Sequence, residues 1–202
     1  MPSGGCFVDV GSNRGPFACL AGRAVGDQGT VVAVEPNRTL WRPLLMNLER
    51  HVGGRFLFVP AAIAEGPGWM SLVVDSTAHT GGGHLAVGSE SGAPGTEVPV
   101  RPVETAIAPF IPEDSPELRI KIDVEGAELI VLRSLAGILE RPECRGVLVE
   151  ICPEYLDRFG GSREEIYAFM DECGFDPRLD RDEADEILRR DTVYDQWFQR
   201  RD

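Results

Sequence analysis

Short apolar runs alternate along the chain with stretches in which apolar residues recur every three or four positions. The short runs predict buried strands, and the wider spacing predicts helices that turn one face toward a sheet. The predicted strands cover residues 6–10, 30–35, 56–59, 69–74, 96–100, 118–123 and 146–151, and two more begin at 175 and 193. The predicted helices cover residues 16–25, 39–50, 103–110, 129–139 and 163–173. Strands and helices that alternate in this way predict an α/β fold with a doubly wound, mostly parallel sheet.

Two of the predicted strands, 69–74 and 96–100, are typical of a β-hairpin inserted into this pattern. Residues 75–95 between them are rich in Gly, Ser, His and Thr, and a loop of this length is usually a functional lid or disordered. We therefore expect an insertion with a flexible loop over about residues 69–101. Near the end of the chain, the strand–loop–strand pattern from 175 to 198 fits an antiparallel last strand at the edge of the sheet.

The chain has 202 residues, of which 43% are hydrophobic, enough to bury a core as a single domain over residues 1–202. Its formal charge of −13, from 33 acidic and 20 basic residues, disfavours binding to nucleic-acid phosphates or to anionic membranes. The five cysteines are scattered and form no Cys-x-x-Cys pair, so neither a zinc knuckle nor a disulfide framework is indicated. The sequence shows no signal peptide and no long apolar span. We expect a cytoplasmic protein without nucleic-acid or membrane partners.

The first predicted strand runs directly into a glycine turn, residues 11–15, with the sequence Gly-Ser-Asn-Arg-Gly. Gly11 and Gly15 permit backbone angles and a close approach that a side chain would block. The next helix offers unpaired N–H groups beside the turn, at the edge where parallel strands end and nucleotide-like ligands bind. The spacing is neither that of dinucleotide-binding enzymes nor that of phosphate-binding loops. With Asp9 just before it, the turn suits a ligand with a cationic head, such as S-adenosylmethionine (SAM); the alternative is an ordinary strand–turn–helix unit without a ligand.

A second acidic residue, Glu35, ends the second strand twenty residues beyond Gly15. Nucleotide-binding folds place an acid here to accept hydrogen bonds from ribose hydroxyls, whereas the alternative is a surface Glu at the end of a strand. Small residues after the third strand, among them Ala62, leave room for a flat ring such as adenine. Asn47 lies on the predicted helix 39–50, where it faces either solvent or the cofactor.

Acidic residues also gather at the ends of the later strands. Asp123 ends one strand, Glu125 and Glu128 follow it closely, and Glu150 lies near the end of the next. Converging carboxylates have two explanations: a base whose pKa is raised by its neighbours, or a Mg²⁺ ion held by oxygen ligands. Glu128 has a third interpretation, since an acid in the first turn of a helix favours its positive end.

Four features occur in order along the chain. They are residues 9–15 (Asp-Val-Gly-Ser-Asn-Arg-Gly), Glu35-Pro36-Asn37, Asn47 in a helix, and residues 121–128 (Lys-Ile-Asp-Val-Glu-Gly-Ala-Glu). Together they resemble the FkbM-type family of SAM-dependent methyltransferases, from about residue 7 to about residue 175, and the last run is the more specific signal. The resemblance implies a Rossmann-like sheet of about seven strands with one antiparallel edge strand. It also implies methyl transfer from SAM, usually to a hydroxyl oxygen.

The resemblance further implies where SAM binds, with its ribose on Glu35. The predicted cofactor-binding residues are Asp9, Gly11, Ser12, Asn13, Gly15, Glu35, Pro36, Asn37 and Ala62. Many members of the family have N-terminal helices that help to cover the cofactor, and almost nothing precedes the first strand here. We expect the glycine- and histidine-containing loop or the second subunit of a homodimer to cover the pocket, or else an unusually open pocket.

Methyl transfer from a sulfonium to a hydroxyl requires alignment of the two reactants and removal of the hydroxyl proton, by a base or a bound metal. The predicted catalytic residues are Asp123, Glu125 and His84, the last because a neutral histidine on a mobile loop is a competent base. Asp123, Glu125 and Glu150 would hold Mg²⁺ if a divalent cation is required. The sequence thus predicts a SAM-dependent O-methyltransferase for a small-molecule acceptor, a secondary metabolite or sugar. The alternatives are an N-methyltransferase and a catalytically idle SAM-binding module that acts by interaction.

Overall fold

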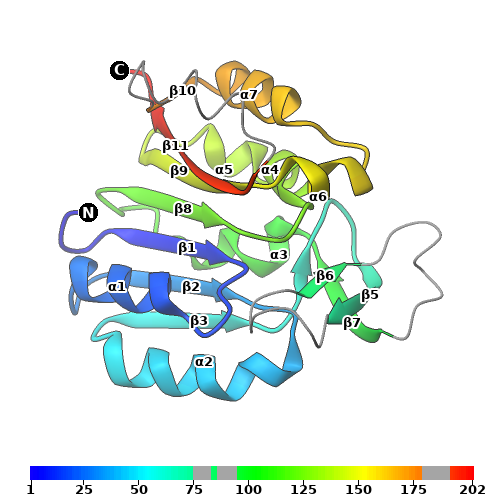
Figure 1. Cartoon of the computed structure of the whole chain (residues 1–202). Coiled ribbons are helices and arrows are strands. Elements are labelled where there is room, and N and C mark those ends of the chain that lie inside the picture. Colours follow the sequence, from blue (N-terminus) through cyan, green and yellow to red (C-terminus); the bar gives the residue numbers. More distant parts are fainter. Residues whose placement is uncertain (75–82, 86–94, 179–191) are drawn as a thin grey trace.

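The computed structural model describes residues 1–74, 83–85, 95–178 and 192–202 (Figure 1). A seven-stranded sheet has the spatial order β10-β11-β9-β8-β1-β2-β3. In chain order these strands are β1 (Cys6–Val10), β2 (Thr30–Val34), β3 (Arg55–Val59), β8 (Leu118–Ile122), β9 (Cys144–Ile151), β10 (Phe175–Pro177) and β11 (Tyr194–Arg200). The five neighbours from β3 to β9 run parallel. The predicted α/β class with a mostly parallel sheet of seven strands is confirmed.

Helices cover both faces of this sheet (Figure 1). One face carries α1 (Pro16–Val25) and α2 (Arg38–His51), and the other carries α3 (Val103–Ala106), α4 (Glu128–Ser134), α5 (Ala136–Leu139) and α7 (Arg163–Glu172). Strand β2 shows how the sequence builds both layers. Its Val31 and Ala33 pack with α1 and α2, whereas Val32 and Val34 belong to the larger core on the opposite face. Because successive side chains of a strand point to opposite faces, a continuous apolar run buries both of them.

The inserted segment forms a separate four-stranded sheet with the order β4-β7-β5-β6. Its strands are β4 (Ala62–Ile63), β5 (Gly68–Val74), β6 (Gly83–Leu85) and β7 (Thr96–Arg101). β5 and β7 pair antiparallel, so the predicted hairpin is confirmed. β6 lies inside the predicted loop and pairs with β5, while residues 75–82 and 86–94 of that loop lie outside the described residues.

The antiparallel strand near the end of the sheet is confirmed, but it is not the outermost strand. β11 lies between β9 and β10 and runs antiparallel to both, so β10 forms the edge in place of the closing strand 193–198. A single strand cannot show its own neighbours, so the sequence pattern could not order these two.

Three helical segments differ from the prediction. The helix predicted over 103–110 divides into α3 and a short 3₁₀ helix, η2 (Ala108–Phe110), because Pro109 has no backbone N–H to continue the first helix. The helix predicted over 129–139 divides into α4 and α5 at Leu135. α6 (Pro153–Arg158) was not predicted, because its six residues are too few to show a helical period. In the part of the chain that the structure describes, no helix is long and apolar enough to cross a membrane.

Candidate active site

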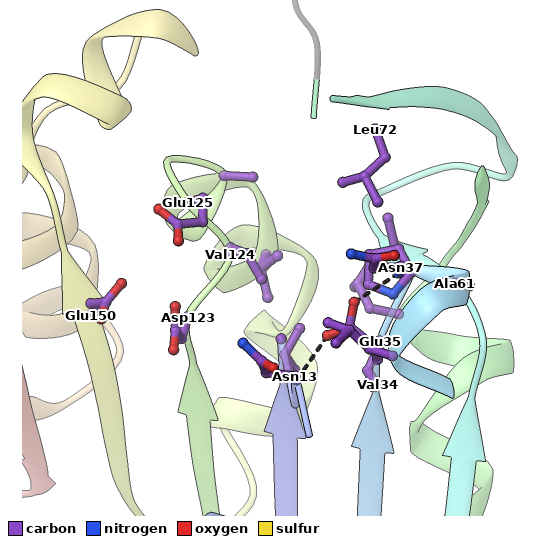
Figure 2. Close-up of a pocket in the computed structure, with 18 residues that line it drawn as sticks. Asn13, Val34, Glu35, Asn37, Ala61, Leu72, Asp123, Val124, Glu125 and Glu150 are labelled. Atoms are coloured by element: carbon purple, nitrogen blue, oxygen red, sulfur yellow. Dashed lines mark hydrogen bonds between the residues drawn. The ribbon is translucent and has the colours of Figure 1, made fainter. Parts of the chain in front are cut away.

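Four neighbouring parallel strands, β2, β1, β8 and β9, have their carboxyl ends on the same side of the sheet. A cavity of about 220 Å³ lies at these strand ends (Figure 2). The predicted site residues that line it are Gly11, Asn13, Glu35, Pro36, Asn37, Ala62, Asp123, Glu125 and Glu150. Figure 2 shows Asp123, Glu125 and Glu150 on one side of the cavity and Glu35 and Asn37 on the other. The cavity therefore has an acidic wall at the ends of β8 and β9, opposite the wall that continues from β2.

Much of the remaining lining is apolar, and the sequence reasoning missed it. Leu72 reaches the cavity from β5 of the insertion, Leu40 from α2 and Val131 from α4. Leu72 is 4% exposed and packs with the insertion's own small core. The period-two pattern of β5 indicates that one of its faces is buried, but it does not indicate that this face meets the end of the main sheet.

The glycine turn after β1 has a backbone conformation that requires glycine at both ends. Gly11 has φ +81° and Gly15 has φ +80°, in the left-handed region. A Cβ atom on Gly11 would lie 1.7 Å from the carbonyl oxygen of Asp123. The N–H groups of Gly11 and Ser12 donate to the carbonyl oxygen of Val34 at 3.0 and 2.9 Å. The turn is thus fixed against the ends of both neighbouring strands.

Asp9 lies beneath this turn and is 1% exposed. Its Oδ2 accepts a hydrogen bond from the N–H of Ala18 at 3.1 Å, which satisfies one of the free donors at the start of α1. The Ser12 hydroxyl donates to the carbonyl oxygen of Asp9 at 2.7 Å. Burial raises the pKa of Asp9 to about 6, and nearby Lys121 opposes that rise. The structure gives Asp9 a supporting contact with the turn, and its direct contact with SAM stays a prediction.

Glu35 joins the glycine turn to the loop that begins α2. Its Oε2 accepts from the N–H of Asn13 at 2.8 Å, and its Oε1 accepts from the N–H of Asn37 at 2.7 Å (Figure 2). The side chain is 6% exposed; burial raises its pKa, and the two N–H bonds lower it. Each carboxylate oxygen can accept a second hydrogen bond, as two ribose hydroxyls would require.

Asn47 also holds the turn, from the middle of α2. Its Nδ2 donates to the carbonyl oxygen of Arg14 at 2.8 Å. Asn47, Ser12 and Gly15 line a second hollow of about 600 Å³, between the turn, α1 and α2. Asn47 therefore acts on the turn itself, a position between the two alternatives that its sequence suggested.

The acidic wall consists of Asp123, Glu125 and Glu150. One oxygen from each carboxylate lies within 4.8 Å of the others. Burial first, and then the charge of Asp123, raise the pKa of Glu150 to about 8, and the same two causes raise the pKa of Glu125. Asp123 is paired instead, with Lys121 Nζ 2.8 Å from its Oδ2. Such a wall can accept a proton or hold a cation.

Glu128 stands apart from the wall, although it was a candidate for the same cluster. It is 1% exposed, and its Oε1 accepts from the N–H of Gly126 at 2.9 Å and from that of Val124 at 3.3 Å. Within the described residues its Oε2 has no hydrogen-bond partner. The carboxylate holds the loop after β8, in which Glu125 has φ +54°. Burial raises the pKa of Glu128 to about 7.

Replacing Glu128 with glutamine is expected to stabilise the protein at high pH. Its pKa is about 7 when folded, against 4.5 for an unperturbed glutamate, so between these values the folded state binds more protons than the unfolded state. The contribution of Glu128 to stability therefore falls as the pH rises, by ~3 kcal/mol in all. Glutamine keeps the acceptor oxygen without the charge. The free energy of unfolding is measured with urea at pH 5 and pH 8. Relative to the wild type, that of Glu128→Gln should be higher at pH 8 than at pH 5. Equal differences at both pH values would contradict this, and Glu104→Gln, at an exposed position of α3, is the control.

His84 falls in β6, opposite Val73 of β5, and its catalytic role stays a prediction. A second histidine of the same loop, His79, is also a candidate base from the sequence, and it lies outside the described residues.

Solved methyltransferases have folds similar to that of this chain. The precorrin-6y C5,15-methyltransferase of Geobacter metallireducens GS-15 aligns over 99% of this chain and 82% of its own, with a TM-score of 0.51 and 11% identity. A SAM-dependent O-methyltransferase of Thermotoga maritima aligns over 99% and 60%, with a TM-score of 0.51 and 12% identity. Fibrillarin of Aeropyrum pernix, solved with natively bound SAM, aligns over 97% and 66%, with a TM-score of 0.51 and 16% identity. At these identities the likeness establishes a shared fold alone.

The architecture is thus that of the Rossmann-like methyltransferases. A family model, the methyltransferase FkbM domain, matches residues 9–177. The chain belongs to the FkbM family of SAM-dependent methyltransferases, which confirms the resemblance seen in its sequence, and the family implies SAM as the methyl donor. No curated protein sequence matches the chain significantly.

Proposed function

We propose that this FkbM-family methyltransferase transfers the methyl group of SAM to a hydroxyl oxygen of a small molecule, a secondary metabolite or sugar. One observation carries the proposal. A single cavity joins the glycine turn and Glu35, on the donor side, to the carboxylates of Asp123, Glu125 and Glu150. An alcohol must lose its proton as the methyl group arrives, and a carboxylate beside the donor is the kind of group that accepts it.

On the donor side, we propose that Glu35 binds the ribose of SAM and that the turn from Gly11 to Gly15 binds its methionine end. Ala62, which is 6% exposed and lines the cavity, would lie beside the adenine. Pro36 and Asn37 line the same cavity next to Glu35. Ser12 and Asp9 support the turn through their mutual contact beneath it.

On the acceptor side, the proposal gives Asp123 the role of base, with Glu125 beside it. A Mg²⁺ ion on Asp123, Glu125 and Glu150 is the second route to the same chemistry, and the closeness of their oxygens favours it. An N-methyltransferase would need less help with a proton, since the lone pair of a neutral amine attacks the methyl group directly and the proton leaves afterwards from the ammonium product. We further propose that the chain acts as one catalytic domain in the cytoplasm, as a monomer or homodimer.

Glu35→Ala is expected to weaken binding of S-adenosylhomocysteine by roughly 100-fold, because hydrogen bonds to a charged group contribute ~1.5–3 kcal/mol each. The substitution also leaves the N–H groups of Asn13 and Asn37 without their acceptor. Isothermal titration calorimetry measures the affinity. Glu49→Ala, at an exposed position of α2, should leave it unchanged. Equal affinities for wild type and Glu35→Ala would remove the ribose assignment.

The acceptor is tested by mass spectrometry. Purified protein is incubated with SAM and a panel of sugars, polyols and hydroxylated metabolites, with amines as a second panel, and products are examined for the gain of one methyl group. Methylation confined to hydroxyl compounds supports the proposal. Methylation confined to amines would replace it with N-methylation, and SAM binding without transfer to either panel would favour the idle module.

A further inference from the structure

Lys121 occupies an unusual position in the centre of the main sheet. It lies in β8 between Ile120 and Ile122, pairs in register with Asp9 of β1, and is 4% exposed. Neighbouring β8 side chains point into the larger core, whereas Lys121 points toward α1, where its Nζ lies 4.8 Å from the centroid of the Phe17 ring. Burying an ammonium group is costly unless oppositely charged groups surround it.

Two carboxylates surround this ammonium group, and they belong to different halves of the site. The Nζ of Lys121 lies 2.8 Å from Asp123 Oδ2 and 4.0 Å from Asp9 Oδ1. Asp9 supports the glycine turn from below, through its bond to Ala18, and its Oδ1 has no hydrogen-bond partner among the described residues. Asp123 lines the cavity on the acceptor side (Figure 2). Lys121 therefore connects Asp9, which supports the donor turn, to Asp123, the proposed base.

The contact with Lys121 also distinguishes the two oxygens of Asp123. Oδ2 accepts a hydrogen bond from the ammonium group, so Oδ1, which does not bond to Lys121, is the oxygen better placed to meet an acceptor. A carboxylate with one oxygen fixed has a defined direction, and misplacement of a reacting group by about 1 Å can cost ~100-fold in rate. The backbone of Asp123 is fixed as well, because its N–H donates to the carbonyl oxygen of Val10 at 3.0 Å.

We propose that Lys121 is a positioning residue for methyl transfer: it holds Oδ2 of Asp123 so that Oδ1 faces the acceptor, and it ties this carboxylate to Asp9 beneath the donor turn. The inference rests on the proposed function, since it assumes that Asp123 acts on the acceptor. A merely structural Lys121 would balance the buried charge of Asp9 and would have no effect on the chemical step. The two roles predict different behaviour when Lys121 and Asp9 are changed together.

The test compares three variants with the wild type. Lys121→Met removes the ammonium group and keeps the length of the side chain. Lys121→Met/Asp9→Asn also removes the buried carboxylate that would be left without its partner, and so guards against a single variant that fails to fold. Arg119→Met is the control, because Arg119 lies two residues earlier in β8, bonds to Glu117 and stacks on the Trp197 ring, outside the lining of the cavity.

Four quantities are measured for each variant: the thermal unfolding midpoint, the affinity for S-adenosylhomocysteine, and kcat and KM with the best acceptor from the mass-spectrometric panel at saturating SAM. Lys121→Met should unfold at a lower temperature, and its kcat should fall by ~100-fold while KM for the acceptor changes by less than about threefold. The double variant should recover the unfolding midpoint but keep the low kcat. Arg119→Met should match the wild type in kcat and KM.

The outcomes separate the two proposals. Recovery of kcat in the double variant, or an unchanged kcat in Lys121→Met, would overturn the positioning role and leave the proposed function standing. A wild-type protein that binds no S-adenosylhomocysteine, or that methylates no acceptor, would overturn the proposed function and this inference with it.

Discussion

Gly11→Ala is expected to abolish binding of SAM and S-adenosylhomocysteine. The φ of +81° alone costs an L-residue about 1–2 kcal/mol. The larger effect is steric, because the added methyl carbon would lie 1.7 Å from the carbonyl oxygen and 2.8 Å from the carbonyl carbon of Asp123. These are backbone atoms that cannot turn aside, so the ends of β1 and β8 must separate. That separation displaces the turn and the proposed base together.

Gly160→Ala is the matched control for this prediction. Gly160 also has a positive φ, +68°, but an added Cβ would meet nothing within 4 Å. It should therefore lose only ~1–2 kcal/mol of stability from the backbone conformation and bind S-adenosylhomocysteine like the wild type. Calorimetry and thermal unfolding of both variants measure the two effects. Wild-type affinity in Gly11→Ala would show that the turn is not part of the cofactor site.

The glycine turn also shows how much of the site can be predicted from the sequence. Its two glycines, with Asp9 before them and Glu35 after the next strand, suffice to predict a nucleotide-like site at the edge of a parallel sheet. The sequence does not reveal what Gly11 avoids, because the carbonyl of Asp123 is more than a hundred residues away along the chain. Close approach between distant backbones is decided by strand order, which a local pattern does not contain.

The acidic residues show the same limit more sharply. Asp123, Glu125 and Glu128 are almost adjacent in sequence, so a sequence pattern treats them as one cluster. In the structure the chain turns at Glu125, whose φ of +54° lies in the left-handed region. The carboxylate of Glu128 accepts hydrogen bonds from N–H groups of this loop, whereas Asp123 and Glu125 line the cavity. Glu150 joins them from another strand. Periodicity indicates which residues share a helix face, but not which carboxylates a loop uses to satisfy its own backbone.

The insertion illustrates a third limit. The alternation in 69–74 and 96–100 was enough to predict its hairpin, which the structure confirms. The two short strands β4 and β6 have two and three residues, too few for any period to appear. Yet β4 contains Ala62 and Ile63, which line the cavity, so a strand that the sequence pattern does not show contributes to the site.

Asp123→Asn is expected to lower kcat by ~100- to 10,000-fold, the usual contribution of a general base. Asparagine has nearly the same shape, and the substitution leaves the backbone carbonyl oxygen of residue 123 in its place beside Gly11. The affinity for S-adenosylhomocysteine should therefore change little. Turnover is measured as formation of S-adenosylhomocysteine with the acceptor found by mass spectrometry. Asp114→Asn makes the same chemical change at an exposed position before β8 and should leave turnover unchanged. A fully active Asp123→Asn variant would end the role of Asp123 as base.

Removal of divalent cations separates the two routes by which Asp123 could act. If Asp123 is the base, wild-type protein dialysed against a chelator keeps its full activity. If Asp123, Glu125 and Glu150 hold a cation instead, chelation removes activity and added Mg²⁺ restores it. Glu150→Gln then serves as an independent check. It leaves the base route largely intact because a Glu150 with a pKa of about 8 already carries its proton at neutral pH. In the metal route it removes one of the three carboxylate ligands that the described residues offer.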